Sequence, residues 1–343
     1  MSKPPAAAGG VIHDATGRTR GEVTIGEHPA ETMDVPDGVT ANGHHDEAED
    51  GGVVSGEGTT PAPGAGWRSR VADVLDFARR QLDGDSEVDQ FGFDPEFNSR
   101  VLMPIARMLY QQWFQIRMQG LAHVPDAGPA LVVANHSGTL PLDALMLQAG
   151  LHDEHPAGRN LRLLGADLVY EIPLLAPLAR KGGHTRASRA NAHALLRSGE
   201  VVGVFPEGFK GIGKPFSDRY QLRRFGRGGF AATAIRARVP IVPCAIVGAE
   251  EIYPLIGNAP ALAQVLKLPY FPITPLFPWL GPLGAVPLPS RWIIEFCPPV
   301  PTCDYEPGSE NDPAVIADLS DRVRGTIQRK LGGLLAERGP AFA

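Results

Sequence analysis

Short apolar strands alternate with helical segments from about residue 121 onward, and this alternation constrains the fold more than any other feature. Strands of this type need crossover connections when they are separated by helices. We therefore predict an α/β fold with a mostly parallel sheet flanked by helices. The pattern predicts strands at 130–134, 161–164, 201–205, 241–247 and 292–296, and helices at 142–150, 188–197, 228–238 and 313–337.

The chain falls into four predicted regions: 1–66, 67–120, a catalytic domain at 121–300 and a helical segment at 301–343. Residues 1–66 carry a formal net charge of −8, which leaves +2 for the rest because the whole chain is −6. This first region has few large apolar side chains, so we expect a disordered acidic tail. The nearly neutral remainder argues against nucleic acid as the main partner.

Two amphipathic helices are expected between residues 67 and 120. The first covers about 71–82, and the second runs from about Pro95 to Met118 with a broad apolar and aromatic face flanked by arginines. A helix of the second kind can lie in a bilayer interface or pack on the main domain, and the pattern does not separate the two.

A charge-free run at 268–290 contains seven prolines, which a helix cannot accommodate. We expect an extended apolar loop there, with the aromatic stretch 269–280 contacting a membrane surface, although a loop folded over the sheet is the alternative. The sequence predicts no spanning helix and no secretory signal. Its three cysteines lack metal-ligand spacing, so we expect no metal site and free thiols in a reducing compartment. With the predicted membrane contact, this indicates a peripheral protein on the cytoplasmic face of the membrane.

The first candidate site follows the strand 130–134. Asn135, His136 and Ser137 come directly after this strand, and Asp143 follows seven residues after the histidine. Ligands in open α/β sheets bind beyond the carboxyl ends of strands. A histidine there can accept a proton from a hydroxyl, and a carboxylate can orient its ring. Alternatively, Asp143 only satisfies amides in the first turn of its helix.

The second candidate site follows the strand 201–205. Phe205, Pro206, Glu207 and Gly208 form a turn in which the carboxylate is aimed by its neighbours. Lys210, Lys214 and Arg219 follow closely, and they can hold a phosphate or face solvent. An ordinary turn with Pro and Gly chosen for backbone geometry is the alternative.

A third element is Ser188 with Arg189, which opens a helix. The arginine suits bidentate contact with a phosphate. Ser188 can equally be a plain helix cap with an exposed arginine after it.

Together these elements resemble the glycerolipid acyltransferase family, which includes lysophosphatidate and other lysophospholipid acyltransferases. The resemblance covers about residues 120–251 and rests on Asn-His-Ser…Asp from 135, Ser-Arg-x-Asn from 188, Gly-Glu-Val-Val-Gly-Val-Phe-Pro-Glu-Gly from 199, and Val-Pro-Ile-Val-Pro from 239. The stretches 225–230 and 248–251 look like the branch that also contains diacylglycerol acyltransferase-like proteins.

The resemblance implies an O-acyltransferase that uses acyl-CoA or acyl carrier protein as donor and a membrane lipid as acceptor, without a metal or other cofactor. His136 would be the general base and Asp143 its orienting partner. The acceptor would be bound by residues at the other motif positions: Asn135, Ser137, Arg189, Phe205, Pro206, Glu207, Gly208 and Lys210.

One departure from the family pattern concerns the six residues between His136 and Asp143, where the family has four. A fully helical stretch would separate the two side chains by about 10 Å along the axis, so a non-helical loop is required for contact. From the resemblance we expect a 1-acylglycerol-3-phosphate-like acceptor. The alternative, which the longer gap favours, is diacylglycerol or another neutral lipid alcohol. The longer gap also leaves a catalytically silent lipid-binding protein as a rival hypothesis.

Overall fold

The computed structural model describes residues 87–137, 140–172, 175–265 and 270–340. All of them belong to the second of the two compact units into which the chain divides, Gly64–Ala343. The predicted acidic tail at 1–66 and the predicted helix at 71–82 lie outside the described residues.

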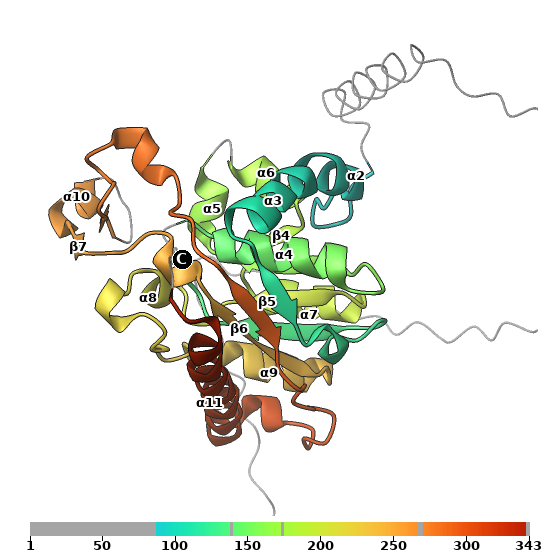
Figure 1. Ribbon diagram of the computed structural model, residues 1–343. Helices are drawn as coiled ribbons and strands as arrows, with labels where there is room; N and C mark the ends of the chain where they lie inside the picture. The colour runs from blue at the N-terminus through green and yellow to red at the C-terminus, as the bar shows by residue number, and fades with distance from the viewer. Residues whose placement is uncertain (1–86, 138–139, 173–174, 266–269, 341–343) are drawn as a thin grey trace, which may run out of the picture. The chain divides into compact units, whose positions relative to one another are not determined.

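A seven-stranded sheet forms the centre of this unit, with the order β1-β9-β6-β2-β5-β3-β4 (Figure 1). The strands β6, β2, β5, β3 and β4 are parallel, whereas β9 is antiparallel to β6 and β1 is parallel to β9. The predicted α/β fold with a mostly parallel sheet is thereby confirmed. The strands are β1 (Arg117–Gln119), β2 (Ala130–Ala134), β3 (Leu161–Gly165), β4 (His184–Arg186), β5 (Val201–Val204), β6 (Ile241–Val247) and β9 (Ile293–Phe296).

Helices connect these strands, and the four that the sequence predicts within the catalytic and C-terminal regions are all present within a few residues of their expected ends. The α-helices are α2 (Pro95–Phe97), α3 (Met103–Met108), α4 (Leu142–Glu154), α5 (Asp167–Glu171), α6 (Leu175–Lys181), α7 (Arg189–Arg197), α8 (Phe209–Ile212), α9 (Gly229–Ala237), α10 (Pro260–Val265) and α11 (Pro313–Arg338). Single turns of 3₁₀ helix lie at Leu121–His123, Phe216–Asp218, Ala249–Glu251, Gly281–Ala285 and Ser309–Asn311.

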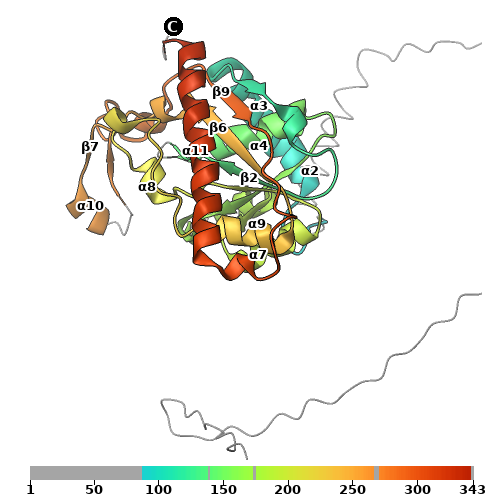
Figure 2. The same cartoon turned by 90° about the horizontal axis from the view of Figure 1, so that it is seen from below.

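Alternate side chains of the strands face two separate apolar cores. In β2, Ala130 and Val132 join the core beneath α3 and α4, whereas Leu131 and Val133 pack with α7, α9 and α11 on the opposite face. Figures 1 and 2 show these two groups of helices on the two sides of the sheet. The unit is therefore a three-layer structure, and both faces of β2 are buried, as its continuous apolar run requires.

The helical segment that begins at Pro95 ends at Trp113, with π-helical turns at Asn98–Leu102 and Leu109–Trp113. The prediction of a helix as far as Met118 is wrong. Gln115 adopts a left-handed backbone conformation (φ 44°), and the next residues pair with β9 as the edge strand β1. Ile116 and Met118 extended the helical apolar pattern, but they pack against the core from this strand.

The contacts of this helical segment show which of its two predicted locations is correct, the main domain or a bilayer interface. Met103, Ala106 and Tyr110 are buried in the core, so the segment packs on the main domain. Ile105 and Met108 on its other side are 54% and 53% exposed. The segment therefore combines a packed face with apolar side chains that remain open to solvent.

The proline-rich run lies between β6 and β9, in a long connection that packs at one side of the sheet. Its described part is largely irregular, as predicted, but it contains β8 (Pro272–Ile273), which pairs with β7 (Gly257–Asn258), and the turn Gly281–Ala285. None of the helices in the described ranges is long and apolar enough to cross a membrane.

Candidate active site

The two predicted catalytic segments lie side by side at the carboxyl edge of the sheet. Val133 of β2 pairs in parallel register with Val204 of β5, so both strands end at the same level. The residues that follow β2, from Asn135 to Ser137, therefore meet the turn that follows β5, from Phe205 to Gly208. β6 ends at the same edge on the other side of β2 and leads to Glu250.

His136 and Asp143 are in direct contact. The ring Nδ1 of His136 lies 2.7 Å from Oδ2 of Asp143, and the same oxygen accepts a hydrogen bond from the amide of Ser137 at 2.8 Å. The other oxygen, Oδ1, accepts from the amide of Ala144. α4 begins only at Leu142, and the predicted return of Asp143 to the histidine is observed.

The two partners differ in their exposure to solvent. The Asp143 side chain is fully buried, whereas that of His136 is 15% exposed. Since Nδ1 faces the carboxylate, Nε2 is the ring nitrogen that remains for a substrate. The Phe205 ring packs against the imidazole with centroids 4.7 Å apart, which restricts its rotation.

The Glu207 carboxylate is turned inward rather than toward a substrate. Its Oε1 accepts from the backbone amide of His136 at 3.2 Å, and its Oε2 accepts from the amide of Arg223 at 2.7 Å. Gly208 has φ of 55°, a conformation that glycine adopts without strain. A β carbon on Gly211 would lie 3.0 Å from the His136 carbonyl oxygen, so the loop after the turn also lies against the histidine backbone.

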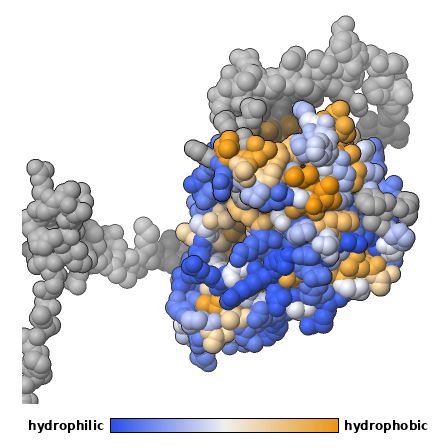
Figure 3. Space-filling model, turned by 90° about the vertical axis from the view of Figure 1, so that its left-hand side faces the viewer, coloured by the Kyte–Doolittle hydropathy of each residue, from blue (hydrophilic) through white to orange (hydrophobic). Residues whose placement is uncertain are grey.

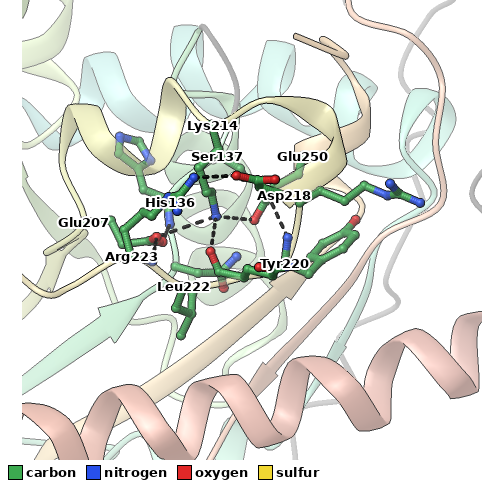
Figure 4. A network of polar contacts seen from close by, with 12 residues as sticks. His136, Ser137, Glu207, Lys214, Asp218, Tyr220, Leu222, Arg223 and Glu250 are labelled. Carbon is green, nitrogen blue, oxygen red and sulfur yellow. Dashed lines mark hydrogen bonds and ion pairs between the residues drawn. The ribbon is translucent and has the colours of Figure 1, made fainter. Parts of the chain in front are cut away.

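A buried lysine extends this arrangement. Lys214 Nζ lies 3.0 Å from Oε1 of Glu250 and 3.6 Å from Oε2 of Glu207, and Glu250 Oε2 accepts from the amide of Tyr220 at 3.0 Å. Figure 4 shows these side chains converging between the ends of β5 and β6. Burial raises the pKa of Glu250 to about 7, against the opposing effect of the Lys214 ammonium.

Three of the predicted substrate ligands need correction. The Asn135 side chain is fully buried, and its amide both donates to and accepts from the backbone of Ile246, which fastens β2 to β6. Ser137 is 1% exposed and contacts Asp143, and Glu207 is 4% exposed. Burial places these three side chains out of reach of a substrate, so they position the site instead.

The remaining predicted ligands lie closer to solvent. Phe205 and Pro206 are half-buried, and Lys210 is exposed in α8. A depression of about 280 Å³ beside the turn is lined by Glu207, Phe209, Lys210, Arg224 and Gly226. The side chains of Lys210, Arg224 and Phe209 thus border a depression beside Glu207, which contacts the backbone of His136.

Arg189 is the exposed first residue of α7. Ser188 caps this helix by accepting from the amide of Asn191 at 3.0 Å, as its alternative interpretation proposed. The Arg189 Nε lies 3.7 Å from the point where a β carbon on Gly229 would stand. The guanidinium is therefore next to the start of α9, three residues from Gly226 in the wall of the depression.

Sequence reasoning missed Glu250 and Arg224 as members of the site. A signal for Glu250 was present, because it follows the carboxyl end of the predicted strand 241–247, as His136 and Glu207 follow theirs, whereas Arg224 carries no comparable signal. Lys214 was expected to hold a phosphate or to face solvent, but its side chain is buried between Glu207 and Glu250. Among the described residues, no group of three or more His, Cys, Asp or Glu side chains is gathered in the manner of a metal site.

The fold and the site define an α/β enzyme whose histidine is oriented by a buried carboxylate. The acyltransferase family model matches residues 115–247. An uncharacterized protein of Mycobacterium tuberculosis is 54% identical over 272 residues, which are 79% of this chain and 76% of that protein. One of Mycobacterium leprae is 51% identical over 286 residues, with 83% and 78% covered.

Two further similarities concern proteins whose names state an activity. A human protein named DGAT1/2-independent enzyme synthesizing storage lipids is 25% identical over 224 residues, 64% of this chain and 66% of that protein. The crystal structure of the 1-acyl-sn-glycerophosphate (LPA) acyltransferase PlsC from Thermotoga maritima is similar with a TM-score of 0.47 and 17% identity, covering 68% of this chain and 78% of that one. The chain belongs to the acyltransferase family and is an acyltransferase.

The raised pKa of Glu250 predicts a pH-dependent stability. The group binds its proton more tightly in the folded state, about 7 against 4.5, so its contribution is complete below pH 4.5 and is lost as pH rises through 7. Relative to Glu250→Gln, the wild type should lose up to about 3 kcal/mol of unfolding free energy between pH 5 and pH 8. Urea unfolding at a series of pH values measures this difference.

The matched control is Glu306→Gln, which removes an exposed carboxylate. Its difference from the wild type should stay nearly constant over the same range. A Glu250→Gln difference that is equally constant contradicts the raised pKa.

Proposed function

We propose that the protein transfers a fatty acyl group from a thioester donor, acyl-CoA or acyl carrier protein, to the hydroxyl of a glycerolipid acceptor. The observation that carries this proposal is the 2.7 Å contact between His136 Nδ1 and the buried Asp143, with the ring partly open to solvent. A neutral imidazole held in this way presents Nε2 as a base to an incoming hydroxyl.

The reaction follows from this geometry. Nε2 of His136 takes the proton of the acceptor hydroxyl while its oxygen forms a bond to the thioester carbonyl carbon. Collapse of the tetrahedral intermediate breaks the carbon–sulfur bond, and the imidazolium returns the proton to the departing thiolate. Asp143 fixes the tautomer with the proton on Nδ1 and stabilises the imidazolium while it exists.

The walls of the depression support an acceptor that carries a phosphate. Lys210 and Arg224 border it, and Arg189 stands at the adjacent start of α9. Cations hold phosphate oxygens through charge-assisted hydrogen bonds, and Phe209 offers apolar contact for a lipid beside them. A 1-acylglycerol-3-phosphate-like acceptor therefore fits the charges better than a neutral one.

Diacylglycerol or another neutral lipid alcohol is the second candidate acceptor. It is favoured by the similarity to the human protein, whose name refers to the synthesis of storage lipids. The silent lipid-binding alternative rested on the altered His–Asp spacing, and the direct contact between the two side chains removes that reason.

A peripheral contact with the cytoplasmic face of a membrane completes the proposal. Several large apolar side chains of the connection between β6 and β9 are exposed, and Figure 3 shows hydrophobic residues gathered on the side of the unit where α10 and β7 lie. Trp113 Nε1 donates to the carbonyl of Pro287, so the helical segment 95–113 adjoins this connection. We call the following residues the apolar edge: Ile105, Met108, Trp113, Ile256, Val265, Trp279, Leu280, Leu283 and Val286, which are 40% to 77% exposed.

Replacing the proposed base should abolish transfer. In an assay with radiolabelled oleoyl-CoA and a panel of lysophosphatidate, other lysophospholipids and diacylglycerol, His136→Ala should lower kcat at least about 100-fold, since general base catalysis contributes this much. Asp143→Asn should also lower kcat strongly, because an amide no longer fixes the productive tautomer.

His152→Ala provides the matched control. His152 also contacts a carboxylate, Asp153, at 2.7 Å, but it lies near the other end of α4. Its replacement should leave kcat within about twofold of the wild type, since no substrate group reaches it. Equal activity of His136→Ala and the wild type would refute the mechanism.

Lys210→Met should separate the two acceptor classes. Loss of one charge-assisted contact raises KM for lysophosphatidate about tenfold or more, but leaves KM for diacylglycerol unchanged. Lys210→Arg should retain most of the affinity for the phosphate. An equal effect of Lys210→Met on both acceptors would count against phosphate binding in the depression.

The apolar edge should govern binding to vesicles. Trp279 and Leu283 are 73% and 68% exposed, and their joint replacement by serine should lower the partition coefficient onto phosphatidylglycerol-containing vesicles at least about tenfold. Sedimentation with the vesicles measures it. Val88→Ser, at an apolar side chain that is 49% exposed elsewhere, serves as control, and equal partitioning of all variants would disprove the membrane contact.

A further inference from the structure

The most unusual charged group near the site is the ammonium of Lys214. Its side chain is only 2% exposed, and it lies between two carboxylates, 3.0 Å from Glu250 and 3.6 Å from Glu207. Its third neighbour is the carbonyl of Gln221 at 3.3 Å. A charge in such surroundings is retained only because its partners compensate for the lost hydration.

This cluster joins three segments of the chain that meet at the carboxyl edge of the sheet. Glu207 belongs to the turn after β5, Lys214 to the loop after α8, and Glu250 to the turn after β6. The amides of Tyr220 and Arg223 donate to the two carboxylates, so the loop between α8 and α9 is held at both ends of the cluster. Figure 4 shows the loop wrapped around it.

A continuous series of contacts leads from the cluster to the proposed base. Lys214 faces Oε2 of Glu207, which leaves Oε1 directed at the backbone amide of His136. Without the ammonium, Glu207 would be a buried carboxylate that has lost the cation facing its Oε2, and it would have reason to rotate away. The backbone amide of His136 would then lose its acceptor, and the backbone that carries the imidazole ring would no longer be held in place.

Stability alone gives little reason for such a pair in this position. Exchange of a buried ion pair for apolar side chains of similar volume is often neutral or stabilising. A shift of about 1 Å in a reacting group, by contrast, can lower the rate about 100-fold. The place of the pair beside the base, rather than deep in either core, therefore suggests a role in the reaction.

We propose that Lys214 and Glu250 are positioning residues for acyl transfer, which hold the Glu207 carboxylate and thereby the backbone of His136 in the place from which its ring meets the acceptor hydroxyl. This inference rests on the proposed function, in which His136 is the base.

The test removes the pair together. Lys214→Met with Glu250→Met takes away one charge of each sign and removes the ammonium that faces Oε2 of Glu207. The control is Arg338→Met with Glu251→Met, which removes a buried ion pair that is 5% and 2% exposed and joins α11 to the residue after Glu250. Both double variants are first compared with the wild type by urea unfolding.

We expect kcat of the Lys214/Glu250 variant to fall at least tenfold while KM for the acceptor changes less than threefold, because the base moves and the binding walls do not. The control should keep kcat within twofold of the wild type. A Lys214/Glu250 variant with kcat equal to that of the control would overturn the inference. If it does not fold, Glu250→Gln, which keeps the volume, should lower kcat at least threefold at unchanged KM, and unchanged kcat overturns the inference as well.

A second readout does not depend on activity. With ¹⁵N-histidine labelling, the amide signal of His136, assigned through His136→Ala, should shift in the Lys214/Glu250 variant and stay in place in the control, because its acceptor Glu207 has moved. Absence of a shift rejects the positioning role even if no acyl transfer is detected. Absence of transfer by the wild type, with the shift present, rejects the proposed function alone.

Discussion

The parallel pairing of β2 with both β5 and β6 determines where the functional side chains of this protein can lie. All three strands end at one edge, so the chain that leaves each of them must turn there. The bond between Asn135 and the backbone of Ile246 fastens the first of these turns to the third strand at its last residues. The backbone of His136, the residue after Asn135, is therefore held in place, and contacts with Asp143 and Phe205 fix the orientation of its ring.

Two buried carboxylates share the task of holding this histidine, and they act on different parts of it. Asp143 contacts the ring, and it also accepts hydrogen bonds from the backbone amides of Ser137 and Ala144. Glu207 contacts the main chain of the same residue. A ring held only through its side chain could still move with its loop, and a fixed backbone alone would leave the ring free to rotate. Both constraints are needed to define the position of Nε2.

The sequence was sufficient for the parts of the fold and site that depend on local pattern. Continuous apolar runs identified the buried strands, and the position after a strand end correctly placed His136 and the turn at Glu207 at one edge of the sheet. The short strands β1 and β4 were missed because three residues give too little periodicity, and β1 was absorbed into the preceding helix. The assignment of Asn135, Ser137 and Glu207 as substrate ligands failed for another reason. Position in the chain shows that a polar side chain lies at the edge, but not whether it points outward or inward.

The apolar edge is linked to the site by tertiary contacts between the β6–β9 connection and the loop that carries Lys214. The amide of Phe216, in the loop that carries Lys214, donates to the carbonyl of Leu255 at 2.9 Å, and Gly213 lies beside the ring of Tyr270. The connection between β6 and β9, which carries most of the apolar edge, is therefore attached to the loop that encloses the buried cluster. A lipid acceptor held at this edge would lie next to the segment that fixes His136. The proline-rich connection thus does more than cover the sheet, because its irregular backbone places apolar side chains beside the residues proposed for the reaction.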